Sequence, residues 1–203
     1  MKIETWNVVS GCERLTPGCD NCPTYWEYKE KGWNYHPKEH EDRLIDPLEN
    51  LTPSVYMVAT GSDLFHEAVS AEFINDVFDV MRQADWHQFQ IVTKRAERLE
   101  AVSRYLKWPA NAIAGIALEE GKYKWRIDCL RNVDATRIIS FGPMTGAMGK
   151  LDLSGIHQAG VVVEHWGPNP RPIKAEWIDE IHKQCEEQGV TILDKYWLSK
   201  ETV

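Results

Sequence analysis

Residues 112–118 read AIAGIAL, an unbroken run of seven apolar residues. A strand with one face in water alternates apolar and polar side chains, whereas a strand covered on both faces is apolar throughout. The run therefore predicts a buried strand of a parallel sheet. Glu119 and Glu120 follow at once and mark the point where the strand ends.

Further short apolar runs lie on both sides of this strand, and helical patterns separate most of them. Strands are predicted at residues 55–60, 89–93, 137–141, 160–164 and 190–193, with a weaker one at 4–9. Helices are predicted at residues 23–32, 70–84, 95–106, 122–133 and 174–188. The alternation predicts an α/β fold of six to seven parallel strands with right-handed crossovers. A doubly wound sheet and an open or partial (β/α) barrel both satisfy it.

Helix 70–84 has the clearest local signals. Ser70 is the expected N-cap, because its hydroxyl can accept a hydrogen bond from a free backbone N–H group in the first turn. Five apolar residues fall on one stripe of the helix and are expected to face the core. They are Phe73, Val77, Val80, Met81 and Ala84.

The composition is that of a globular protein. The chain has 203 residues, of which 43% are hydrophobic and 27% charged, and residues 1–203 are expected to form one domain. The net charge of -8 argues against phosphate binding over the whole surface. No apolar run of about eighteen residues predicts a membrane span, and the N-terminus lacks a signal-peptide pattern. A cytoplasmic location with reduced thiols is therefore expected.

Three of the five cysteines lie close together in GCERLTPGCDNC, residues 11–22. Cys12, Cys19 and Cys22 have the spacing C-x6-C-x2-C. An odd number of cysteines fits a set of disulfides poorly. The other two, Cys129 and Cys185, lie in helical patterns and are interpreted as small buried hydrophobic residues.

Thiolates are soft ligands that favour zinc, copper(I) or iron-sulfur clusters. A structural zinc site needs a fourth ligand, and His36 or His40 would complete a Cys3His set. A [4Fe-4S] cluster on three cysteines instead leaves one iron free to bind S-adenosylmethionine (SAM), whose cleavage gives a 5′-deoxyadenosyl radical. The usual spacing for that chemistry is C-x3-C-x2-C. A cluster, a zinc ion and no metal all stay open from the spacing alone.

Polar residues follow most of the predicted strands, and the carboxyl ends of parallel strands meet at one edge of the sheet. Functional groups are therefore expected to gather there, beside the three cysteines. The main groups are Thr60 to Asp63, Thr93 to Arg95, Glu119 and Glu120, Glu164 to Trp166, and Asp194 to Trp197.

Several ordered segments resemble a bacteriophage radical-SAM-like family. TWNVVSGCERLTPGCDNC (residues 5–22) resembles an opening of W-N-P-V-T-G-C followed by S-P-G-C-x-x-C-Y. ATGSDLFHEAV (59–69) is similar to M-S-D-L-F-H-x-x-V, and HQFQIVTKRAERL (87–99) to F-Q-x-L-T-K-R-P-E-R. NAIAGIALEE (111–120), EHWGPNPRPIKAEWI (164–178) and LDKYW (193–197) continue the resemblance over nearly the whole chain.

The resemblance implies a partial barrel of the radical SAM type with a [4Fe-4S] cluster on the three cysteines. It also implies a SAM site at the strand ends, formed by Gly61, Ser62, Asp63, Thr93, Lys94 and Glu119. Asp63 would receive the amino group of SAM, and Lys94 would pair with its carboxylate. An alternative interpretation of Arg95 is a surface charge at a helix start. An electron donor such as flavodoxin or ferredoxin is the expected partner.

The resemblance further implies a phage-encoded protein that acts in the host cytoplasm on a modified thymidine, in DNA or as a nucleotide. One implied reaction is the rearrangement of glycyl-thymidine. Glu164, His165 and Lys195 are expected to face the substrate as catalytic groups. Trp166 and Trp197 are candidates for base stacking. Four basic residues are candidates for a phosphate contact: Lys94, Arg95, Arg171 and Lys174.

The chain departs from the family pattern in three places. Gly142-Pro143 stands where the family has Glu-Pro, Val162-Val163-Glu164 where it has Gly-Gly-Glu, and Pro23 where it has tyrosine. These positions surround the expected mouth of the site and bear on its substrate. His66 is expected near the cluster or as the cap of a turn. Two alternatives are a zinc-stabilised nucleic-acid-binding module without catalysis and a barrel that has lost its cluster.

Overall fold

The computed structural model describes residues 1–167 and 169–193. Seven strands form one sheet, and every neighbouring pair in it is parallel. Their order across the sheet is the order in which they occur in the chain. They are β1 (Lys2–Trp6), β4 (Ser54–Val58), β5 (Gln88–Thr93), β6 (Ala112–Leu118), β7 (Thr136–Phe141), β8 (Gln158–Val161) and β9 (Thr191–Ile192).

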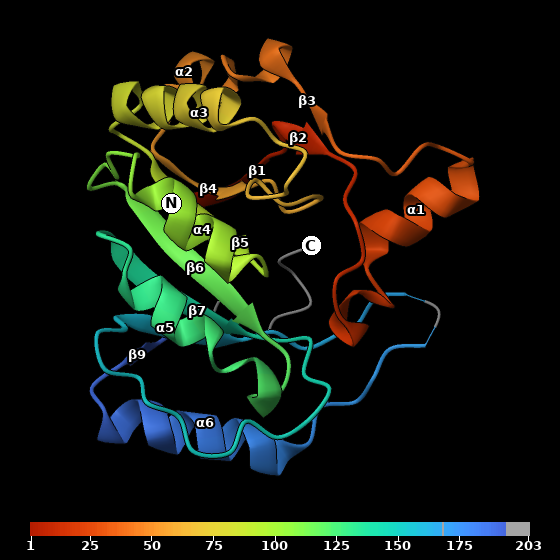
Figure 1. The fold of residues 1–203 in the computed structure, drawn as a ribbon, viewed down its shortest axis with the longest axis vertical. Helices are drawn as coiled ribbons and strands as arrows, with labels where there is room; N and C mark the ends of the chain where they lie inside the picture. Colours follow the sequence, from red (N-terminus) through yellow and green to blue (C-terminus); the bar gives the residue numbers. More distant parts are fainter. Residues whose placement is uncertain (168, 194–203) are drawn as a thin grey trace.

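This strand order decides between the two predicted architectures. A doubly wound sheet reverses its order at a switch point, so that helices cover both faces. An unreversed order with crossovers of one hand places the helices along one face instead. Figure 1 shows the helices following one another from α3 at the top, through α4 and α5, to α6 at the bottom. The sheet therefore has the topology of an open, partial (β/α) barrel.

The helices match the predictions with shifted ends, except that the short helix Asp46–Glu49 was not predicted. They are α1 (Pro23–Lys31), α2 (Asp46–Glu49), α3 (Ala71–Gln83), α4 (Ala96–Ser103), α5 (Arg126–Arg131) and α6 (Ala175–Glu187). Ser70 caps α3 as predicted, because its hydroxyl accepts a hydrogen bond from the backbone N–H of Phe73 at 3.1 Å. All five residues of the predicted stripe are buried. Helices α4 and α5 are shorter than predicted, and a 3-10 turn, Gly121–Tyr123, precedes α5.

Strand β6 is buried along its whole length, as its apolar run predicts. Gly115 in its middle allows the neighbouring strands to pack tightly. A Cβ atom added there would lie 2.8 Å from Ile138 Cγ2 and 2.9 Å from Val92 Cγ2. Because such contacts require the neighbours to move, a side chain at this position would overpack the sheet.

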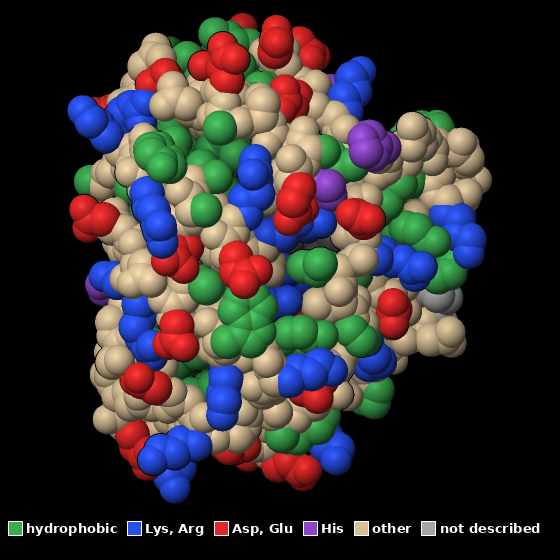
Figure 2. All heavy atoms as spheres, viewed as in Figure 1, with side chains coloured by type: hydrophobic (Ala, Val, Ile, Leu, Met, Phe, Trp, Pro, Cys, Tyr) green, Lys and Arg blue, Asp and Glu red, His purple; other side chains and the backbone are tan. Residues whose placement is uncertain are grey.

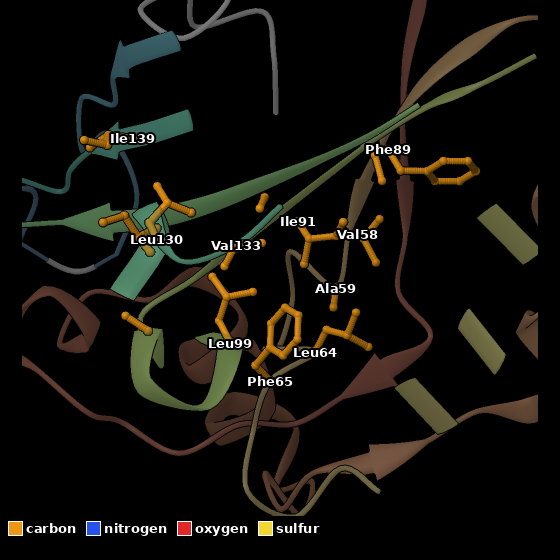
Figure 3. Close-up of a cluster of buried hydrophobic side chains, with 14 of the residues drawn as sticks. Val58, Ala59, Leu64, Phe65, Phe89, Ile91, Leu99, Leu130, Val133 and Ile139 are labelled. Carbon is orange, nitrogen blue, oxygen red and sulfur yellow. The ribbon is translucent and has the colours of Figure 1, made fainter. Parts of the chain in front are cut away.

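The segment after β4 is fixed by two buried side chains. Leu64 and Phe65 are fully buried in the core, and Figure 3 shows both beside Leu99 of α4. Burial of such side chains stabilises the fold by about 1.5–3 kcal/mol each. Asp63, directly before them, is therefore held in one place at the carboxyl edge of the sheet.

The N-terminal strand differs from the prediction. Instead of one strand over residues 4–9, the chain forms β1 and, after a break, β2 (Val9–Ser10), which pairs antiparallel with β3 (Lys38–Glu39). The break arises because β1 reaches its last ladder partner at Trp6, whereas the backbone carbonyl of Val8 accepts a hydrogen bond from His40 N at 2.9 Å. The chain turns here from the main sheet towards the cysteines.

The predicted strand 160–164 begins and ends earlier, as β8. The last ladder bond runs from Val162 N to Phe141 O at 2.8 Å, and Glu164 lies beyond it. Cys185 is buried as predicted, but Cys129 is only half-buried, because it lies on the side of α5 that also carries the exposed Asp128 and Asn132. None of the helices within the described residues is long and apolar enough to cross a bilayer.

Candidate functional site

The cysteine loop, residues 11–22, crosses the carboxyl edge of the sheet between β2 and α1. Its start is fixed by a hydrogen bond from Cys12 N to Tyr35 O at 2.8 Å. Cys19 is the last residue of the 3-10 turn Pro17–Cys19, and Cys22 is the N-cap of α1. Pro23 suits the first position of that helix, where no backbone N–H group is needed.

Each of the three thiols faces a different hydrogen-bond donor. Cys12 Sγ lies 3.9 Å from Arg95 Nη1, and Cys19 Sγ lies 3.4 Å from Lys94 Nζ. Cys22 Sγ lies 3.7 Å from the hydroxyl of Tyr35. All three cysteines are free of disulfides. Two cations and a phenol therefore surround the sulfur atoms.

The half-buried phenol of Tyr35 lies beside the cysteine loop, where its hydroxyl contacts Cys22 Sγ. Burial raises its pKa above the ordinary value, and the negative charge of thiolates at Cys22, Cys12 and Cys19 raises it further. Tyr35 therefore stays a neutral phenol that can donate a hydrogen bond to Cys22. Nothing in the sequence spacing predicted a role for this residue.

The surroundings give two of the thiols opposite acidities. Burial and the nearby carboxylate of Asp63 raise the pKa of Cys12 to about 11. Burial also acts to raise the pKa of Cys19, but the charge of Lys94 and hydrogen bonds from the loop outweigh it, so this pKa is lowered. The reactive thiolate form is therefore favoured at Cys19 and disfavoured at Cys12.

We expect iodoacetamide to alkylate Cys19 faster than Cys12 in the metal-free protein at neutral pH, because both thiols are half-buried and only the thiolate reacts. Mass spectrometry of peptides from a timed reaction measures both rates. A Lys94→Met variant removes the cation beside Cys19 and should bring the two rates closer. Equal rates in the unaltered protein would contradict the assignment.

Asp63, expected to receive the amino group of SAM, is held by donors of the protein itself. The Thr93 hydroxyl lies 2.7 and 2.8 Å from its two carboxylate oxygens. Arg95 Nη1 lies at 3.0 Å, and Phe65 N donates at 2.9 Å. Arg95 also pairs with Glu67 at 2.8 Å.

The interpretation of Arg95 as a surface charge is wrong. Its side chain is buried, and it joins Asp63 to the cysteine loop through Cys12. A buried arginine is tolerated here because two carboxylates pair with it. Charge at a helix start, seen in the sequence alone, does not reveal such partners.

Glu119 forms a second buried cluster. Its carboxylate is 0% exposed and accepts hydrogen bonds from Lys94 at 2.6 Å, Thr16 at 2.6 Å and Arg126 at 2.8 Å. Burial acts to raise its pKa, but the charge of Lys94 and these hydrogen bonds outweigh it, so the pKa is lowered. The ionised carboxylate thus ties the cysteine loop at Thr16 to the end of β6.

Glu164 and His165, two of the expected catalytic residues, lie in different surroundings. Glu164 is buried and accepts hydrogen bonds from Asn21 at 3.0 Å and from two nitrogens of the Arg171 guanidinium at 2.6 and 2.8 Å. His165 is exposed, with Nδ1 3.1 Å from Val163 O. Lys195 lies outside the described residues. Glu164 therefore anchors the loop, while His165 stays open to solvent.

Three of the four basic residues expected to contact phosphate are paired within the protein. Lys94, Arg95 and Arg171 are each paired with a buried carboxylate. Lys174 is exposed and lies over Trp177. A contact of these residues with phosphate stays a prediction. Trp166 contacts His165 edge-on, and Trp197 lies outside the described residues.

The remaining residues of the predicted SAM site lie at the end of β4. Gly61 N donates to Asn7 Oδ1 at 3.1 Å, and the Ser62 hydroxyl donates to Gly11 O. Both are half-buried. His66 caps a turn as predicted, because its Nδ1 accepts from Ala68 N at 3.0 Å. The structure thus brings the predicted strand-end residues together but pairs most of them with one another.

Two of the departures from the family pattern are neighbours in space. A Cβ atom at Gly142 would lie 2.3 Å from Val162 O, and the glycine has φ +147°, where residues with side chains rarely occur. The glycine and the valine therefore belong to one local arrangement at the ends of β7 and β8.

Sequence reasoning did not identify four residues that hold the site together. Thr16 and Asn21 carry no spacing signal, because their partners Glu119 and Glu164 lie 103 and 143 positions away. Tyr35 and Arg126 lie closer to their partners, Cys22 and Glu119. Arg126 could have been noticed, since it is a charged residue next to the buried Ile127 within a predicted helix.

The two histidines of the zinc hypothesis have other surroundings. His40 Nε2 lies 2.6 Å from the Ser10 hydroxyl, and His36 is exposed. Ligands of a single zinc ion, each about 2.1–2.3 Å from it, must lie close to one another. Among the described residues, no three His, Cys, Asp or Glu side chains are grouped to hold one metal ion. Cysteines on a multi-iron cluster bind different irons and lie farther apart.

Comparison with known proteins gives one family match and two similar structures. A family model described as "Protein of unknown function (DUF5131)" matches residues 2–202. A structure of a spore photoproduct lyase mutant has a TM-score of 0.55 and 12% identity, covering 95% of this chain and 76% of the lyase. A structure of spore photoproduct lyase complexed with dinucleoside spore photoproduct has a TM-score of 0.46 and 11% identity, covering 94% and 63%. No curated protein sequence matches the chain.

The likeness at a TM-score of 0.55 concerns the fold. Together with the unreversed order of seven parallel strands, it confirms the expected α/β class and the partial (β/α) barrel, a fold that resembles that of spore photoproduct lyase. The edge of this barrel that carries the three thiols is the edge where such folds place their functional groups.

Proposed function

The chain belongs to the family described as "Protein of unknown function (DUF5131)", and within that family we propose that it is a radical SAM enzyme. The substrate that we propose is a modified thymidine, in DNA or as a nucleotide. The reaction is an isomerisation or a lyase reaction, for example the rearrangement of glycyl-thymidine. Fold alone does not determine function, so the proposal rests on the site.

The arrangement of the three free thiols is the observation that supports the proposal most. Cys12, Cys19 and Cys22 lie on one loop at the carboxyl edge of the barrel, where they contact Arg95, Lys94 and Tyr35 respectively. Ligand sulfurs of a cluster are thiolates, and cations and hydrogen bonds near them favour that charged form. The donor set therefore fits a [4Fe-4S] cluster held by three cysteines.

A cluster of this kind with SAM supplies a carbon-centred radical that removes hydrogen from an unactivated carbon. The protein residues provide the surroundings for that chemistry. Lys94 places positive charge beside Cys19 and stabilises its thiolate. Arg95 places positive charge beside Cys12, where it opposes the larger effects of burial and of Asp63. Tyr35 can donate a hydrogen bond to Cys22.

We propose that the segment at Gly61 and Ser62 binds the methionine part of SAM, because it is half-buried at the strand ends and next to Gly11 of the loop. Asp63, Thr93, Lys94 and Glu119 border this site. Asp63 is paired with Arg95, and Glu119 is paired with Lys94 and Arg126. These residues therefore shape the site and hold the loop.

His165 is the described catalytic candidate that is open to a substrate, and it could move a proton there. Glu164 is proposed as a positioning residue, because its oxygens are occupied by Arg171 and Asn21. A catalytic role of Lys195 stays a prediction. An electron donor such as flavodoxin or ferredoxin, and a phage-encoded origin with action in the host cytoplasm, are part of the same proposal.

The test is anaerobic reconstitution with iron and sulfide, followed by reduction in the presence of SAM. We expect a brown protein that absorbs near about 400 nm and forms 5′-deoxyadenosine. Nucleosides from phage DNA carrying modified thymidine, analysed by mass spectrometry after incubation, then identify the product. A colourless protein with one tightly bound zinc ion and no SAM cleavage would favour the zinc module.

A further inference from the structure

Helix α1 directly follows the last cysteine and carries aromatic residues that the core does not use. None of its nine residues is buried, and Figure 1 shows the helix projecting from the rest of the molecule. Trp33, just beyond it, is 54% exposed. Helix α1 and the segment after it place five aromatic rings together, which we call the ring surface: Tyr25, Trp26, Tyr28, Trp33 and Tyr35.

The rings of this surface contact one another in an unbroken series. Tyr35 lies between Tyr25 and Tyr28, with ring centroids 5.4 and 5.3 Å apart. Tyr25 contacts Trp26 at 5.6 Å, and Tyr28 contacts Trp33 at 5.4 Å. Edge-to-face packing of this kind holds the rings in fixed positions without a core. The series leads from two tryptophans at its ends to Tyr35, which contacts Cys22 of the cysteine loop.

A cation lies over a ring at three positions of the ring surface. Arg14 is 4.6 Å from the Tyr25 centroid, and Lys29 is 4.3 Å from that of Trp26. Lys31 is 4.3 Å from the Trp33 centroid. Figure 2 shows basic and hydrophobic side chains next to one another on this projecting part. Lysine stems are flexible, so these ammonium groups can leave a ring face and meet an anion nearby.

The local charge differs from that of the whole protein. Residues 14–35 contain three cations and three carboxylates, whereas the chain has a net charge of -8. Two of the carboxylates are paired, Glu27 with Lys31 at 2.5 Å and Asp20 with Arg14 at 3.8 Å. The ring surface is therefore a nearly neutral region on an acidic protein, where a polyanion meets less repulsion than elsewhere.

We infer that the ring surface binds a single-stranded or unpaired stretch of nucleic acid, with bases stacked on Trp26 and Trp33 and phosphates near Lys29 and Lys31. Planar rings that alternate with anions are the chemistry of a nucleic-acid strand, and stacking platforms with nearby cations are how proteins bind it. The inference rests on the proposed function and names the surface that brings the substrate strand to the cysteine loop.

The test measures binding of a dye-labelled thymidine oligonucleotide to the protein without its cluster, by fluorescence anisotropy. We expect Trp26→Ala with Trp33→Ala to weaken binding at least about tenfold, because each stacked base contributes substantially. Tyr105→Ala is the matched control, since this ring is 88% exposed and far from the cysteines in sequence. Replacing Lys29 and Lys31 by glutamine should lower the dependence of binding on salt.

Circular dichroism must show unchanged folding in the tryptophan variant, which is expected because α1 buries no residue. The inference is overturned if the oligonucleotide does not bind, or if the tryptophan variant and the Tyr105→Ala control bind equally. Oligonucleotide binding that stays intact in the tryptophan variant, together with slower reduction of its reconstituted cluster by a flavodoxin, would overturn the inference and assign the surface to a redox partner. The anisotropy assay uses protein without its cluster. Its result therefore does not depend on whether the proposed radical chemistry is correct.

Discussion

Replacing Cys12, Cys19 or Cys22 by alanine is expected to abolish the absorption near about 400 nm of the reconstituted protein. A cluster held by three thiolates loses a ligand in each variant, and no other cysteine of the chain lies in the loop. Iron and sulfide content, measured after removal of unbound metal, should fall together with the absorption. This is the largest effect expected for any single substitution in the chain.

Cys129→Ala is the matched control, because this thiol is also half-buried but lies in α5. It should keep the full iron content. His36→Ala and His40→Ala complete the experiment, since a zinc site of the Cys3His type depends on one of them. Loss of metal from a histidine variant as complete as from the cysteine variants would contradict the cluster.

Replacing Glu119 by alanine is expected to lower the free energy of unfolding by about 3–5 kcal/mol. The carboxylate is fully buried and holds Lys94 and Arg126, so its removal leaves two cations without their partner. It also removes the acceptor of the Thr16 hydroxyl and so loosens the cysteine loop. Urea unfolding followed by circular dichroism measures the change.

Glu120→Ala is the control for this experiment, because the neighbouring carboxylate is partly exposed and pairs with Lys122 at the surface. Such a pair contributes about 0–1 kcal/mol. The lowered pKa of Glu119 also predicts a pH dependence. Its contribution is complete above the unfolded pKa of about 4.3 and is lost as the pH falls through the lower folded value. Equal unfolding midpoints for both variants would refute the proposed role.

The sequence predicted the parts of the protein that are encoded locally. The apolar run of β6 and the capping serine of α3 depend on neighbours in the chain, and both are confirmed. The choice between two sheet architectures was open, because local patterns do not contain strand order. The placement of functional residues at one edge followed from parallel strands alone.

The pairing of these residues could not be predicted. Thr16 and Glu119 are 103 positions apart, and Arg95 meets Asp63 across 32. Local patterns therefore predicted that Asp63 binds a ligand and that Arg95 is a surface charge, whereas in the structure the two side chains neutralise each other. Buried charges must find partners, but which partners they find is set by the folded chain.

The hydrogen bonds that hold the cysteine loop in place join it to residues far along the chain, and this has a consequence for synthesis of the protein. Pro17 O accepts a hydrogen bond from Arg171 at 2.8 Å, and Thr16 is fastened to Glu119. The ribosome synthesises the loop first, and Glu119 and Arg171 long afterwards. The loop therefore gains its final contacts only when most of the chain has been translated, so the proposed cluster would be assembled on the finished polypeptide and not on the nascent one.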